Sequence, residues 1–146
     1  MELLVLLLVI GGVVLVTQSV SRHPGRSLAI AGGCESAVID HNTIAAAQRG
    51  NGFENYACKG ATLTNNAIYK NAAYGARQSP SAGTTPTVGH NGYFANAGGP
   101  RSGIATGSRD LTSDPGFAHI TRIEAKSPYR GAGSPGDIGA NVVNRY

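Results

Sequence analysis

The sequence VIDHNTI places Asp40 directly before His41. A carboxylate beside an imidazole is a pair that can move protons in general acid–base catalysis. His90 lies in a similar stretch further along the chain, and Arg49 and Arg77 lie where we expect adjoining loops. These five residues are weak candidates for a catalytic site, and the elements that carry them decide whether they can act together.

The stretch around Asp40 is one unit of an internal repeat. AVIDHNTI, ATLTNNAI and PTVGHNGY start at residues 37, 61 and 86, so the unit recurs after 24 and then 25 residues. Their alignment gives three columns, which are Ile39, Leu63 and Val88; Asn42, Asn66 and Asn91; and Ile44, Ile68 and Tyr93.

Two weaker units extend the repeat at its ends. VLVTQSV supplies Leu15, Gln18 and Val20 to the three columns, and DLTSDPGF supplies Leu111 and Asp114 to the first two. Neither extension breaks the apolar column, so we count about five turns of the repeat.

A period in the low twenties predicts a solenoid in which each turn makes short strands that pair in parallel with the next turn, about 4.8 Å away. The apolar columns then form the interior. An asparagine at a fixed bend adopts a left-handed conformation at low cost, and its amide can bond to the amides above and below it. We therefore interpret Asn42, Asn66 and Asn91 as a structural ladder.

The composition agrees with many short strands. Glycine occurs 21 times in 146 residues, tryptophan is absent and charged residues make up 14%, which is unlike a helical domain. A poorly ordered glycine-rich chain is the alternative. The net charge of +4 is spread along the chain, so no basic stripe for nucleic acid is present, whereas an acidic polysaccharide is compatible with it.

Cys34 and Cys58 are also 24 residues apart. In stacked coils their Cα atoms would lie within the range that a disulfide accepts. Two interpretations stay open: a disulfide between them, or two free thiols that pack as small apolar residues.

The apolar run LLVLLLVIGGVVLV, residues 3–16, has three interpretations. It can form two buried strands broken at the glycines, it can be a signal peptide or anchor, or it can be a tilted membrane span. The acidic Glu2 argues against a signal peptide, which is basic at this point. Contact with a membrane is expected only if residues 3–16 act as an anchor.

The stretches VIDHNTI, GATLTNNAIYKNAAYG, HNGYFANAG, DLTSDPGF and AKSPYRGAGSPGDIGANV follow one another between Arg26 and Asn144. In this order they resemble the last coils and closing tail of bacterial proteins with right-handed parallel β-helix repeats, of the pectate-lyase-like superfamily. The resemblance implies an all-β fold, a right-handed parallel β-helix with three parallel sheets. Such proteins are usually secreted and often associated with polysaccharides.

Lyases of the family that this sequence resembles use acidic residues, often with calcium, and an arginine or lysine as the base. Asp40 is expected to be the only acid on a coil strand, and its stacked neighbours Thr64 and Gly89 are not acidic. No metal or cofactor is therefore expected. His41 and His90 lie about 10 Å apart in a column with Asn65, too far to share a metal, and we interpret them as bend residues that face water.

Sugar-stacking surface is a further possibility for aromatic side chains. The candidates are Tyr56, Tyr69, Tyr74 and Tyr93, although Tyr93 occupies an apolar column and is expected in the core. The serine-rich loop of residues 77–86 is the longest insertion, and loops on a rigid scaffold often bind ligands.

We expect an apolar segment at residues 1–20 (an early coil or cap, or a signal or anchor), coils at residues 21–120 and a closing tail at residues 121–146. The leading hypothesis is a monomeric, secreted or cell-surface β-helix domain that contacts carbohydrate, as the C-terminal part of a larger carbohydrate-active protein. A structural or adhesive solenoid without catalysis is the second hypothesis, and a polysaccharide lyase or glycoside hydrolase is the third.

Overall fold

The structure is a computed structural model of the chain. It describes residues 8–10, 13–17, 20–21, 28–30, 35–80, 84–117 and 123–140, and before residue 35 only the course of the backbone. Cys34 and residues 81–83 of the serine-rich loop lie outside this set. No helix occurs in the described ranges, and hence none there is long and apolar enough to cross a membrane.

The described chain forms short strands only. They are β1 (Leu8–Ile10), β2 (Val13–Thr17), β3 (Val20–Ser21), β4 (Leu28–Ile30), β5 (Ser36–Asp40), β6 (Thr43–Ala45), β7 (Phe53–Asn55), β8 (Ala61–Thr64), β9 (Ala67–Tyr69), β10 (Tyr74–Gln78), β11 (Thr87–Gly89), β12 (Gly92–Phe94) and β13 (Gly99–Ser102). Because β10 continues to Gln78, the predicted 77–86 loop starts two residues later than expected.

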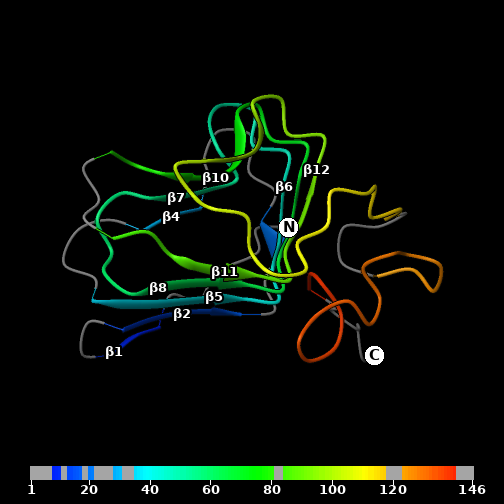
Figure 1. Ribbon diagram of the computed structural model, residues 1–146, viewed down its shortest axis with the longest axis horizontal. Coiled ribbons are helices and arrows are strands. Elements are labelled where there is room, and N and C mark those ends of the chain that lie inside the picture. Colours follow the sequence, from blue (N-terminus) through cyan, green and yellow to red (C-terminus); the bar gives the residue numbers. More distant parts are fainter. Residues whose placement is uncertain are drawn as a thin grey trace.

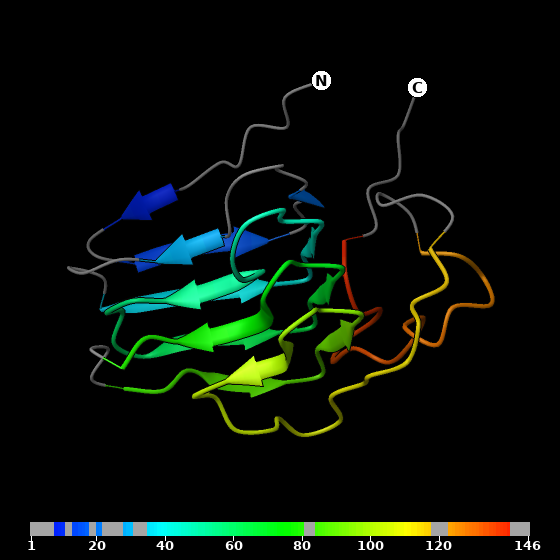
Figure 2. The same cartoon turned by 90° about the horizontal axis from the view of Figure 1, so that it is seen from above.

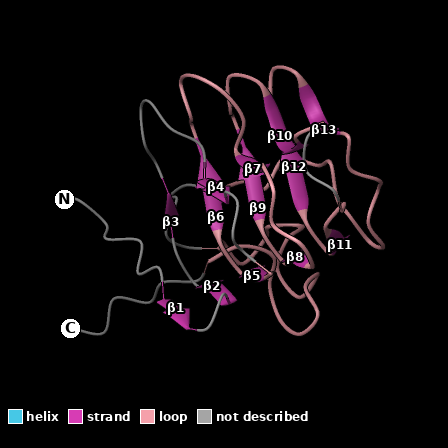
Figure 3. Ribbon diagram, turned by 90° about the vertical axis from the view of Figure 1, so that its left-hand side faces the viewer, coloured by secondary structure: helices cyan, strands magenta, loops and turns pink. Residues whose placement is uncertain are grey.

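The strands build three sheets that run along one stack (Figures 1 and 3). Sheet 1 has the order β1-β2-β5-β8-β11, sheet 2 the order β3-β6-β9-β12 and sheet 3 the order β4-β7-β10-β13. All neighbours pair in parallel except β1, which pairs with β2 in antiparallel fashion. Each coil takes one strand from each sheet, so β2 to β13 make four coils.

The molecule is a right-handed parallel β-helix, as predicted. In Figure 1 the chain passes counterclockwise from β5 through β6 to β7, and the coils advance toward the viewer, as the turned view in Figure 2 shows. This is the hand that connections between parallel strands of a sheet normally have.

The register of the central coils is the predicted one. Ile39 pairs with Leu63 and Leu63 with Val88 in sheet 1, and Ile44 pairs with Ile68 and Ile68 with Tyr93 in sheet 2. Isolated bridges from Gly89 to Ser108 and from Gly92 to Leu111 start a fifth turn.

Both extensions of the repeat were placed wrongly. Val16, and not Leu15, pairs with Ile39, because the first coil is one residue shorter than the alignment assumed. At the other end Leu111 forms a bridge with Gly92. This pairing places Asp110 next to Asn91. Asp114 instead accepts a hydrogen bond from the Gly116 amide at 2.8 Å, within the SDPGF turn.

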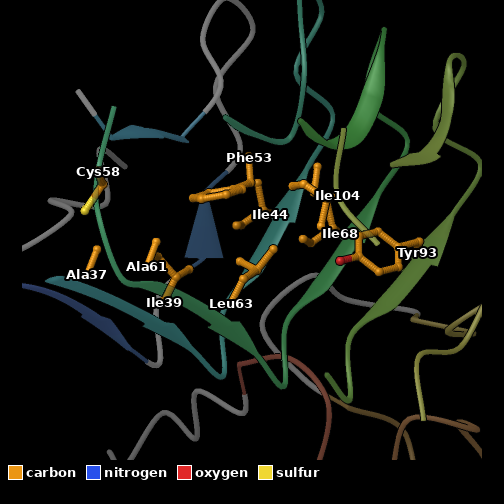
Figure 4. Packing of buried hydrophobic residues seen from close by; sticks show 11 residues of the cluster. Ala37, Ile39, Ile44, Phe53, Cys58, Ala61, Leu63, Ile68, Tyr93 and Ile104 are labelled. Carbon is orange, nitrogen blue, oxygen red and sulfur yellow. The ribbon is translucent and has the colours of Figure 1, made fainter. Parts of the chain in front are cut away.

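The core lies inside the triangle of sheets (Figure 4). Burial alternates along β5 and β8, since one side chain in two points inward from a strand. Its fully buried side chains include Phe53, Ile39, Leu63, Ile68 and Tyr93. The prediction that Tyr93 belongs to the core is confirmed.

The last coil is closed by a charged pair over Tyr93. The guanidinium of Arg101 lies 4.9 Å from the centre of the Tyr93 ring, and its Nη1 donates to Asp110 Oδ2 at 3.1 Å. Asp110 also accepts from the Gly107 amide at 2.9 Å. These contacts cover the end of the core with groups that bond to one another.

The described part of the C-terminal tail, residues 123–140, lies along the side of the stack, next to sheet 2 (Figures 1 and 2). Tyr129 and Ile138 of the tail pack with Ala67 and Tyr69 of sheet 2 in a second apolar cluster. Phe117 contacts Tyr69 and Tyr129 edge to face, with ring centres 5.7 and 5.8 Å apart. The outer face of sheet 2 is therefore covered.

Candidate functional site

The predicted site residues sit on a row of bends between sheets 1 and 2. His41, Asn65, His90 and Arg109 occupy matching positions in successive turns, with φ of 53°, 57°, 54° and 55°. Asparagine and histidine are among the residues that adopt this left-handed conformation most readily. The bend turns the next residue inward, which places Asn42, Asn66 and Asn91 in the interior after the first three bends and Asp110 after the fourth.

The predicted ladder of Asn42, Asn66 and Asn91 next to these bends is confirmed. Asn42 Nδ2 donates to Asn66 Oδ1, and Asn66 Nδ2 donates to Asn91 Oδ1, both at 3.0 Å. The backbone amide of Asn91 then donates to Asp110 Oδ1 at 2.9 Å. All three asparagines are fully buried, so the ladder satisfies polar groups that would otherwise lie unpaired in the core.

A second ladder was missed by the sequence reasoning. Asn71 Nδ2 donates to Asn96 Oδ1 at 2.8 Å, and the Ala47 amide donates to Asn71 Oδ1 at 3.1 Å. The residues before these three, Ala46, Lys70 and Ala95, have positive φ. The signal was the 25-residue spacing of the two asparagines, which the alanine at position 47 obscured.

Asp40 and His41 form a close pair at the end of β5. His41 Nδ1 lies 2.7 Å from Asp40 Oδ2. Asp40 Oδ1 accepts from Thr64 Oγ1 and from Asn65 Nδ2, both at 2.8 Å. Burial acts to raise the pKa of Asp40, but the hydrogen bonds from His41, Thr64 and Asn65 outweigh it and lower this pKa.

The tail covers this row of bends, and the prediction that His41 and His90 face water was wrong. His41 Nε2 lies 2.8 Å from the carbonyl oxygen of Pro135. His90 Nδ1 donates to the carbonyl oxygen of Ala132 at 3.2 Å. We call the contacts of His41, Thr43, Asn65 and His90 with residues 132–140 the tail clasp.

Backbone groups of the tail complete the clasp between the two histidines. The Ser134 amide donates to Asn65 Oδ1 at 2.8 Å and the Gly139 amide to the Asn65 carbonyl oxygen at 2.7 Å. The Ala140 amide donates to Thr43 Oγ1 at 3.0 Å. Nothing in the sequence predicted these contacts, because residues so far apart in the chain do not belong to a common repeat.

The two arginine candidates do not join Asp40 and His41. Arg77 lies on the outer face of sheet 3, where its Nη1 is 3.2 Å from Glu54 Oε1. Arg49 is exposed in the turn after β6. Since Glu54 lies on β7, Asp40 is not the only acid on a coil strand, contrary to expectation.

Other candidate groups are also occupied or dispersed. No cluster of three or more His, Cys, Asp or Glu side chains that could hold a metal occurs among the described residues. Of the tyrosines proposed for sugar stacking, Tyr56 is 45% exposed, whereas Tyr69 is 8% exposed beneath the tail. Cys58 is disulfide-bonded, so its interpretation as a free thiol was wrong. The pairing with Cys34, which lies outside the described residues, stays a prediction.

Comparison with known proteins adds no family. A scan of the sequence against protein-family models found no match, and searches of curated proteins and of solved structures found none either. The arrangement of the described residues is therefore the basis for any functional conclusion. Chemically, the tail clasp holds one segment of the chain on another. His41 bonds to the tail, and Asp40 bonds to His41, Thr64 and Asn65.

Proposed function

We propose that this chain is a secreted or cell-surface β-helix domain that binds polysaccharide along the outer face of sheet 1. The observation that carries the proposal is a row of outward-facing, uncharged side chains in register. Val38 pairs with Thr62 and Thr62 with Thr87. Val38 and Thr62 are half-buried and Thr87 is exposed.

This face differs from the outer face of sheet 2, which the tail covers. On sheet 1 the outward-facing side chains repeat with the spacing of parallel strands, about 4.8 Å. A polysaccharide is a ligand made of repeated units, so a repeated surface offers the same contact to several of them. The net charge of +4 favours acidic polysaccharides.

Retention on insoluble polysaccharides and affinity electrophoresis test the proposal. Thr87→Glu introduces a charge on the row at an exposed position, and we expect it to reduce retention on an acidic polysaccharide about tenfold. Ser102→Glu, at an outward position of β13 in sheet 3, is the matched control and should bind normally. Failure to bind any glycan would contradict carbohydrate binding. An equal loss of retention in Thr87→Glu and Ser102→Glu would contradict the assignment of binding to sheet 1.

The second candidate is a structural or adhesive solenoid without catalysis. It is favoured by the tail clasp, since His41 and His90 contact the tail and Asp40 bonds to His41. Incubation with pectate or alginate, followed by ultraviolet absorbance of the unsaturated product, separates it from a lyase. A steady rise in absorbance that Asp40→Asn abolishes would overturn the non-catalytic candidate.

A further inference from the structure

Both ring nitrogens of His41 face atoms that only accept hydrogen bonds. The carbonyl oxygen of Pro135, 2.8 Å from Nε2, carries no hydrogen. On the other side Nδ1 lies 2.7 Å from Asp40 Oδ2, a length typical of a charged N–H group on a carboxylate. A neutral imidazole has one N–H group and one lone pair, so it can serve only one of these two acceptors.

Asp40 is held as a carboxylate and has no proton to offer His41. Its second oxygen accepts from the Thr64 hydroxyl and the Asn65 amide. These hydrogen bonds and the one from His41 lower the pKa of Asp40 even though burial acts to raise it. A neutral His41 would therefore turn its lone pair toward either the carboxylate or the Pro135 carbonyl.

We propose that His41 holds the tail as an imidazolium, and that the tail loosens from the coils when His41 loses its proton. His41 needs both ring protons to donate to both acceptors. The tail is therefore held while His41 is an imidazolium, and it loosens as the pH rises and the ring gives up one proton.

The other ionisable groups around the clasp do not replace His41. His90 and Arg109 occupy the matching bends, and Arg130 and Asp137 lie on the tail. His90 needs only one N–H group, since its bond is from Nδ1 to Ala132. Asp137 Oδ1 accepts from the Gly131 amide at 2.7 Å, within the tail itself.

Loosening of the tail uncovers an apolar surface. Tyr69 and Ala67 of sheet 2 lie under Tyr129 and Ile138 of the tail. Loosening therefore uncovers this apolar surface more often, by about tenfold for the loss of one charged hydrogen bond.

Side-chain ¹⁵N NMR of His41 and hydrogen exchange of tail amides test the proposal on the whole chain. Where the tail amides are fully protected, we expect both ring nitrogens of His41 to carry protons. As His41 deprotonates, the protection factors of the Ser134 and Gly139 amides should fall at least about tenfold, the effect of losing one charged hydrogen bond. The Gly52 amide, bonded to the Tyr74 carbonyl inside the coils, is the internal reference and should keep its protection.

Two variants identify the histidine. His41→Asn keeps a residue that accepts positive φ but cannot titrate, so the tail amides should lose their pH dependence. His90→Asn makes the same exchange two coils away, and its tail amides should keep their pH dependence. A fully protected tail at a pH at which the NMR spectrum shows a neutral His41 would overturn the proposal in the unmodified chain, and so would a pH dependence that survives in His41→Asn.

Discussion

At the scale of single residues, Asn66 is the most heavily bonded side chain of the ladder. Its Nδ2 donates to Asn91 Oδ1 and to the carbonyl oxygens of Ile39 and Thr64. Its Oδ1 accepts from the amide and the side chain of Asn42. It therefore joins three coils at one buried point.

Asn66→Leu should strongly destabilise the fold. Leucine has a similar size but leaves the Asn42 amide without its acceptor and removes a donor from the carbonyl oxygens of Ile39 and Thr64. Each buried group left unpaired costs about 1–3 kcal/mol. We expect the free energy of unfolding to fall by about 3 kcal/mol or more in urea denaturation. Thr62→Leu, at an outward position of β8, is the control and should change stability little. An unchanged urea midpoint for Asn66→Leu would show that the ladder carries no stability.

The residue types at the bends were predictable, and their partners were not. Asn42 and Asn66 are marked in the sequence because the same amide must recur in each coil to satisfy its neighbour. The partner of His41 is Pro135, 94 residues away, and nothing periodic marks it. An aspartate beside a histidine therefore looked catalytic or solvated, whereas the contact of His41 with the tail decides the role of the pair.

At the scale of elements, the tail depends on the absence of a side chain in β12. A Cβ atom at Gly92 would overlap two ring carbons and the hydroxyl oxygen of Tyr129. Tyr129 is fully buried, and its hydroxyl donates to the Ser113 carbonyl oxygen at 3.0 Å. The ring thus has no room to give way while the tail stays in place.

Gly92→Ala should displace the tail and lower the free energy of unfolding by about 1–3 kcal/mol, the usual cost of overpacking. A double-mutant cycle with Tyr129→Ala isolates the clash. In the Tyr129→Ala background the same glycine substitution should cost little. Equal costs in both backgrounds, measured by denaturation, would place the effect of Gly92 elsewhere than at the tail.

At the scale of the whole molecule, the length of each turn explains where the sequence reasoning succeeded. The coils with equivalent asparagines are 24 and 25 residues long, and there the alignment gave the correct register. The step from Asn91 to Asp110 is only 19 residues, because the chain no longer has to form a full turn where the stack ends. A fixed period therefore pointed to Asp114 and passed over the residue that closes the ladder.

Asp110→Ala should destabilise the end of the stack first. The substitution leaves Arg101, whose side chain is 12% exposed, without its partner, and the Asn91 amide without an acceptor. Removing one partner of a buried pair costs about 3–5 kcal/mol. Hydrogen exchange should show early loss of protection in β11 and β12, while β5 and β6 stay protected.

Arg109→Asn is the neighbouring control for the end of the stack. Asparagine retains the positive φ of this bend, where φ is 55°, and Arg109 is exposed. We expect normal protection in this variant. Uniform loss of protection in all coils of Asp110→Ala would mean that the stack unfolds as one unit rather than from its end.

The course of the tail also has a consequence for how the protein is made. Coils can pair with one another as they leave the ribosome, because each needs only its predecessor. The Ala140 amide bonds to Thr43, 97 residues earlier, so the apolar face of sheet 2 stays open until almost a hundred further residues have been translated. During that interval the nascent chain carries an uncovered surface that chaperones can recognise.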